Sequence, residues 1–144
     1  YDEQNLAVWP KLSVNYTAKT QFLFRINKGV LDVHEDRALN AYKAESDRAV
    51  PFRNMIYIGD GLTDVPCMKL VKQNGGKSIA VYAGDQVETC LRLMREQRIN
   101  FFSEADYSAE AELFALVRTI LEHMKAENLL EARHRSMRDL AALS

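Results

Sequence analysis

The sequence predicts an α/β fold with a mostly parallel sheet, because short apolar runs alternate with amphipathic segments along its second half. Each run is four to six residues long and is bounded by turn residues, which is typical of buried strands. A stretch with helical spacing of apolar residues follows each run. The order strand, helix, strand, helix, strand, helix from residue 54 onward implies right-handed crossovers and therefore parallel strands.

The size and composition indicate a globular protein with one core. The chain has 144 residues, of which 47% are hydrophobic and 27% are charged, a composition unlike that of disordered or membrane proteins. Nineteen basic and 20 acidic residues give a net charge of −1, which offers no general attraction for nucleic acid or anionic lipid. No apolar run approaches the ~20 residues of a membrane span. We therefore expect a cytoplasmic protein with neither nucleic-acid nor membrane partners, and with two reduced cysteines.

The first 50 residues have weaker patterns. Residues 5–15 are extended in character. A helix is expected in the following segment, TAKTQFLFRINKG, because Thr17 can cap its start and Gly29 can close its end. Residues 30–49 look helical, although they are charged and only weakly periodic.

The remaining elements are defined more clearly. Three apolar runs are expected to form strands: 55–58, 78–83 and 99–102. Helices are expected after each of them: from Thr63 or Asp64, over 85–97, and from Ser108. We expect a core domain over residues 1–125 and a helical tail over 126–144. The possible buried points of the tail, which could cover the core or meet a partner chain, are Leu129, Leu130, Met137 and Leu140.

Two aspartates stand where the first of these strands ends. Glycines flank Asp60, and Asp64 follows four residues later. Ligands of parallel sheets gather at the carboxyl ends of the strands, and Mg²⁺ prefers carboxylate oxygens completed by water and phosphate. The pair therefore indicates a metal site. The alternative is structural: Asp64 caps the next helix and Asp60 forms a turn.

The segment YIGDGLTDVP resembles the fourth motif of haloacid-dehalogenase-like hydrolases, and the similarity extends over roughly residues 12 to 125. The resemblance implies a three-layer Rossmann-like core. It also implies a Mg²⁺-dependent phosphatase that acts on a small phosphorylated metabolite through an aspartyl-phosphate. By this resemblance Asp60 is the metal-binding acid, and Asp64 is the second acid, which either holds a metal-bound water or fixes the loop.

A lysine that neutralises the charges of the nucleophile and the phosphate is also implied by the resemblance. We favour Lys19, at the start of the expected helix, over Lys28, which stands at its far end and can simply complement the helix dipole. Lys19 precedes Asp60 by 41 residues, so residues 30–50 are expected to supply an extra helix.

The nucleophile motif of the family, Asp-x-Asp-x-Thr after an apolar strand, does not occur in this sequence. The nearest string, GVLDVHED, offers Asp32 and His34, which we expect on a helix surface. The N-terminal strand, the nucleophile and any cap domain are therefore expected upstream of Tyr1, so this chain alone should be inactive. An upstream polypeptide or a second copy of the chain would complete its sheet. The rival interpretation is a catalytically silent binding or assembly module on the same scaffold.

Overall fold

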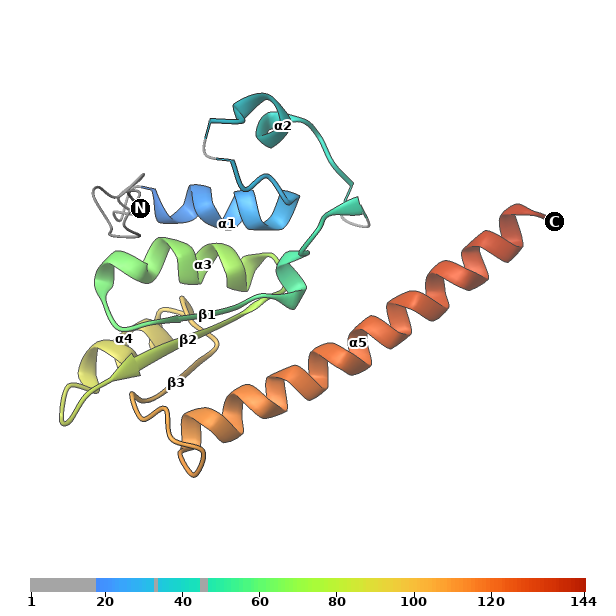
Figure 1. The fold of residues 1–144 in the computed structure, drawn as a ribbon. Coiled ribbons are helices and arrows are strands. Elements are labelled where there is room, and N and C mark those ends of the chain that lie inside the picture. Colours follow the sequence, from blue (N-terminus) through green and yellow to red (C-terminus); the bar gives the residue numbers. More distant parts are fainter. Residues whose placement is uncertain (1–17, 33, 45–46) are drawn as a thin grey trace, which may run out of the picture. The chain divides into compact units, whose positions relative to one another are not determined.

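The computed structural model describes residues 18–32, 34–44 and 47–144. The chain divides into two compact units, Tyr1–Val50 and Pro51–Ser144 (Figure 1). The extended segment expected over residues 5–15, and the expected cap Thr17, lie outside the described residues.

In its described part, the first unit contains one regular helix and one short helix. Helix α1 (Lys19–Lys28) ends as expected at Gly29, which adopts the left-handed conformation with φ 72°. Helix α2 (Asp36–Asn40) has only five residues. The prediction of a helix over residues 30–49 is therefore wrong for the rest of the described part of that range. The segment has no apolar stripe to bury, and the chain becomes extended at Ala41, directly after α2.

Polar side chains occupy the interior of this unit. Arg25 is 3% exposed and donates hydrogen bonds to the Asp32 carbonyl at 2.6 Å and to the Asp36 carboxylate at 2.9 Å. Asn27 is fully buried and donates to the Val50 carbonyl at 2.8 Å. A buried guanidinium and a buried amide thus donate hydrogen bonds to backbone carbonyls, and these bonds hold irregular backbone in place where the sequence pattern predicts a helix.

The second unit is built on a three-stranded parallel sheet, which confirms the predicted α/β class and strand direction. The strands are β1 (Ile56–Gly59), β2 (Lys77–Tyr82) and β3 (Phe101–Glu104), and they lie in the order β1-β2-β3. The helices of the unit are α3 (Val65–Gln73), α4 (Glu88–Arg95) and α5 (Glu112–Ala142), with two short 3-10 turns, η2 (Phe52–Asn54) and η3 (Leu62–Asp64), on either side of β1.

Helices cover both faces of the sheet (Figure 1). Successive residues of a strand point to opposite faces, so Ala80 packs with residues of α3 and α4, whereas Ile79 and Val81 pack with residues of α5. The first cluster comprises Val65, Met68, Ala80, Cys90, Leu93 and Ile99. The second comprises Ile79, Val81, Leu113, Ile120 and Met124.

Strands β1 and β2 differ in how deeply they are buried. The central strand, β2, is buried along most of its length. Within the described ranges β1 pairs with β2 alone, and Ile58 is 37% exposed. The expectation of a buried strand is therefore right for β2 and wrong for β1, whose residues are half-buried or exposed and which has a neighbour on one side only among the described residues.

Helix α5 continues without interruption through the boundary expected at residues 125 and 126. All residues from Leu129 to Ser144 are exposed. The four expected buried points of the tail are thus exposed in this chain, each by 61–69% of its surface: Leu129, Leu130, Met137 and Leu140.

Candidate functional site

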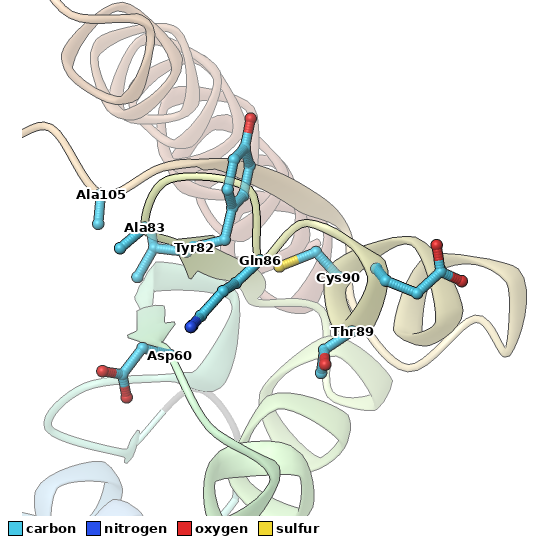
Figure 2. Close-up of a pocket in the computed structure, with 9 residues that line it drawn as sticks. Asp60, Tyr82, Ala83, Gln86, Thr89, Cys90 and Ala105 are labelled. Atoms are coloured by element: carbon cyan, nitrogen blue, oxygen red, sulfur yellow. The ribbon is translucent and has the colours of Figure 1, made fainter.

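Asp60 lies on the loop that follows β1, at the carboxyl end of the sheet. Its exposed side chain lines a pocket of about 410 Å³ (Figure 2). The rest of the wall comes from the end of β2, from the loop and first turn that lead into α4, and from the residue after β3. The pocket thus occupies the place where ligands of open parallel sheets bind.

Several polar side chains beside Asp60 were not anticipated from the sequence. Gln86 and Thr89 line the pocket, and Figure 2 shows the Gln86 amide pointing to the side where Asp60 lies. Cys90 is buried in the wall, and the side chain of the half-buried Tyr82 points away from Asp60 in Figure 2. The sequence does contain a signal for Gln86 and Thr89, because they follow the second strand of the sheet as Asp60 follows the first.

The pocket thiol is not an activated one. Burial raises the pKa of Cys90, so the group stays a neutral thiol at neutral pH. Cys67 and Cys90 are both buried, and no disulfide joins them in the described part of the chain.

Asp64 has surroundings quite different from those of Asp60. It is 7% exposed and does not line the pocket. Its Oδ1 accepts a hydrogen bond from the Tyr57 hydroxyl at 2.7 Å, and its Oδ2 accepts one from the backbone N–H of Gly61 at 3.3 Å. These are the contacts of a residue that fixes the loop, which is one of the two roles left open for it. Asp64 also stands at the cap position of α3, but its side chain makes no capping hydrogen bond there.

Gly59 allows this packing. A Cβ atom at residue 59 would lie 2.7 Å from Cγ of Asp64, closer than two such atoms can approach. The glycine before Asp60 is therefore required by the buried carboxylate of Asp64.

Tyr57 supports the loop from β1. Burial is the main cause that raises the pKa of Tyr57 above the ordinary value, and the hydrogen bond to Asp64 adds to it. The hydroxyl therefore keeps its proton and remains a donor to Asp64 over the whole ordinary pH range. The sequence analysis did not single out Tyr57, because its role depends on the turn that brings Asp64 within hydrogen-bond distance of β1.

The two candidate lysines occupy the two ends of α1. Lys19 is the first residue of the helix. Lys28 donates from Nζ to the carbonyl oxygens of Leu39 at 2.5 Å and Ala41 at 3.0 Å, so its ammonium ties α1 to the end of α2. Lys19 and Lys28 belong to the first unit of the chain, and Asp60 belongs to the second.

Asp32 and His34 lie between α1 and α2, so their expected place on a helix surface is wrong. The Asp32 carboxylate accepts a hydrogen bond from the backbone N–H of His34 at 3.0 Å, a local turn contact. The Asp32 carbonyl oxygen also accepts a hydrogen bond from the Arg25 guanidinium. This bond stabilises the irregular backbone between α1 and α2.

The described residues contain no group of three or more His, Cys, Asp or Glu side chains arranged to hold a metal ion. Two carboxylates line the pocket, Asp60 and Glu88, and Glu88 accepts a hydrogen bond from Arg95 at 2.7 Å. Asp60 fits as one carboxylate ligand of Mg²⁺, an ion that uses one or two protein carboxylates and completes its shell with water and phosphate oxygens. No helix in the described part of the chain is both long and apolar enough to cross a membrane.

Comparisons with known proteins identify one similar protein of unknown role. No family model matches the chain, and no solved structure matches it. An uncharacterized protein of Borreliella burgdorferi strain B31 is 32% identical over 104 residues, which cover 70% of this chain and 34% of that protein. The chain therefore spans about a third of the length of the relative that it matches.

Proposed function

We propose that this chain is the C-terminal part of the core of a haloacid-dehalogenase-like hydrolase, a Mg²⁺-dependent phosphatase acting on a small phosphorylated metabolite. The observation that carries the proposal is the position of Asp60. Its carboxylate lines a pocket at the carboxyl end of a parallel sheet, on a glycine-flanked loop. The loop is held from beneath by Tyr57 and Asp64.

In this proposal the residues of the loop have separate tasks. Asp60 contributes one ligand to Mg²⁺, and the ion, when bound, offsets the charge that develops on the phosphoryl group. Asp64 and Tyr57 keep the loop in the conformation that presents Asp60. Lys19 stabilises the negative charge of the phosphate and the nucleophile.

The nucleophile, in this proposal, lies upstream in a longer polypeptide. Its strand would pair with the edge of β1, where the described residues supply no neighbour. The length of the Borreliella relative, about three times the matched region, is compatible with such an upstream part. A second copy of the chain is the other partner that could complete the sheet.

A catalytically silent binding module is the second candidate. It is favoured by the sequence itself, which contains no Asp-x-Asp-x-Thr motif. Such a module would bind a phosphorylated ligand in the pocket and leave it intact.

Turnover of a generic aryl phosphate by the full-length protein tests the proposal. The wild type should hydrolyse the ester only with Mg²⁺, and Asp60→Asn should lower kcat/KM by about 100-fold or more, because an amide lacks the charge that retains a hard cation. Asp106→Asn is the matched control, since that exposed aspartate follows β3 and its carboxylate accepts a hydrogen bond from the Ser108 N–H. Asp106→Asn should leave turnover unchanged.

Two outcomes would contradict the proposal. Unchanged turnover in Asp60→Asn would remove Asp60 from the metal site. Absence of magnesium-dependent hydrolysis in the wild type, together with saturable binding of the phosphate ester, would favour the silent module instead.

A further inference from the structure

The wall of the pocket beside Asp60 has a polar part and an apolar part. Gln86 and Thr89 line it from the loop after β2 and the first turn of α4, and the Gln86 amide points to the side where Asp60 lies (Figure 2). The small side chains of Ala83 and Ala105 line it from the residues that directly follow β2 and β3. A volume of about 410 Å³ suits one small molecule. A ligand here can therefore present polar groups to one part of the wall and C–H groups to the other.

The polar groups of Gln86 and Thr89 are available to a ligand. Both side chains are exposed, and neither has a hydrogen-bond partner among the described residues. The Gln86 amide can donate and accept hydrogen bonds, and so can the Thr89 hydroxyl. Hydroxyl groups of a ligand also donate and accept, so they match both side chains whichever way each one is turned. The polar part of the wall is therefore suited to a ligand that carries hydroxyl groups.

The charges of the wall disfavour a second anionic group on the ligand. Asp60 and Glu88 are carboxylates, and none of the described residues that line the pocket is a lysine, arginine or histidine. The guanidinium nearest to Glu88, that of Arg95, already pairs with it at 2.7 Å. In the proposed function Mg²⁺ offsets the charges of Asp60 and of the phosphoryl group. A further carboxylate or phosphate of the substrate would then lose water without gaining a counter-charge.

We propose that the substrate is a phosphate monoester whose alcohol part is uncharged and carries hydroxyl groups, such as a phosphorylated polyol, and that Gln86 and Thr89 bind these hydroxyl groups. This inference rests on the proposed function and names the substrate class of the same pocket. The C–H side of the alcohol packs on Ala83 and Ala105. Overall, the bond between phosphorus and the ester oxygen breaks, water gives its hydroxyl group to phosphorus and its other proton to that oxygen, and the polyol leaves.

Two pairs of esters test the substrate class in the full-length protein with Mg²⁺. They are glycerol phosphate against phosphoglycerate, and glucitol phosphate against phosphogluconate, each with the phosphate on the terminal carbon farthest from the group that differs. Within a pair, a carboxylate replaces one hydroxymethyl group. The uncharged member should have the higher kcat/KM by about 10-fold, because the carboxylate finds no counter-charge in the wall. Equal values within both pairs, or a preference for the acids, would overturn the inference.

Variants of Gln86 test the residue that binds the alcohol. Gln86→Leu should lower kcat/KM for glucitol phosphate by about 5–10-fold through a higher KM, and leave kcat/KM for a generic aryl phosphate unchanged, because the aryl ester has no hydroxyl group to lose. Gln86→Lys supplies a counter-charge and should shift the preference toward phosphogluconate. Gln73→Leu is the matched control, since Gln73 is exposed at the end of α3 and does not line the pocket. An equal loss for both kinds of ester in Gln86→Leu, or the same loss in Gln73→Leu, would overturn the role of Gln86.

Calorimetric binding distinguishes this inference from the proposed function. The wild type should bind glucitol phosphate about 10-fold more tightly than phosphogluconate, and Gln86→Leu should lose most of this difference. Binding with this preference, but without hydrolysis of any ester, would contradict the phosphatase and support recognition by Gln86. Hydrolysis of the aryl phosphate, without a preference in binding or turnover within either pair, would support the phosphatase and overturn this inference.

Discussion

The loop after β1 holds two carboxylates of the same type in opposite environments. Asp60 is exposed at the pocket, whereas Asp64 is buried and accepts hydrogen bonds from Tyr57 and Gly61. An exposed carboxylate is available to a cation, and a buried one with donors on both oxygens is a structural anchor. The sequence predicts that both acids matter, but it does not separate their roles, because the burial of Asp64 depends on a hydroxyl from the preceding strand.

Replacing Tyr57 by phenylalanine should loosen this loop. Removal of the hydroxyl deprives a buried carboxylate of a donor, which costs about 1–3 kcal/mol of unfolding free energy. Denaturant unfolding of Tyr57→Phe measures this loss. Tyr107→Phe is the control, because Tyr107 is 69% exposed, and it should have the stability of the wild type.

The pH dependence of stability gives a second readout for Tyr57. Its pKa is raised above the ordinary tyrosine value of 10.0, so above that pH the unfolded chain loses a proton that the folded chain retains. The free energy of unfolding should therefore fall as pH rises above 10, and the fall should be shallower in Tyr57→Phe than in the wild type. Identical slopes in the two proteins would show that the Tyr57 hydroxyl is not held as the structure describes.

At the scale of elements, the sequence predicts the strands and helix α1 well, and it predicts the segment that follows α1 poorly. Turn residues bracket each apolar run, and the strands of the structure begin and end within about two residues of the runs. The first unit instead owes its order to buried polar groups, Arg25 and Asn27, whose partners are backbone carbonyls distant in sequence. Hydrophobic periodicity carries no signal for such contacts, so residues 30–49 were mistaken for a helix.

The two ends of α1 lead to a prediction about the lysines. Lys19→Ala in the full-length protein should slow phosphoryl transfer by about 100-fold, because a cation that faces the phosphoryl group stabilises its transition state. Lys28→Ala should mainly lower stability, since it removes the donor to the carbonyls of Leu39 and Ala41. Single-turnover kinetics and thermal unfolding separate the two effects. Equal losses of rate in both variants, or a larger loss in Lys28→Ala, would show that Lys19 is not the lysine that stabilises the phosphoryl group.

Helix α5 shows a limit of sequence reasoning at the same scale. The spacing of apolar residues from Leu113 to Met124 predicts a helix that packs on the core, and the structure confirms it. The later leucines have equally regular spacing, but they lie on the other side of the helix and are exposed. Which side of a long helix meets the core is fixed by the position of the sheet, which the sequence does not give.

For the whole molecule, the most informative feature is the outer side of β1. Among the residues that the structure describes, β1 pairs with β2 alone, and Ile58 is partly exposed. The α/β class, the parallel sheet and the place of Asp60 at its carboxyl end could all be predicted from the sequence. The pocket wall was not predicted: its one sequence signal is that Gln86 and Thr89 follow the second strand, and whether they reach the pocket depends on how β2 and α4 pack beside β1.

The central claim, that Asp60 binds a divalent cation at this pocket, is tested most directly by metal binding. Mn²⁺ has the same preference for oxygen ligands as Mg²⁺, and its free concentration can be read by electron paramagnetic resonance. The full-length wild type should bind one equivalent of Mn²⁺ that Mg²⁺ displaces, and Asp60→Asn should lose this equivalent while Asp106→Asn retains it. Undiminished Mn²⁺ binding by folded Asp60→Asn protein would contradict the account.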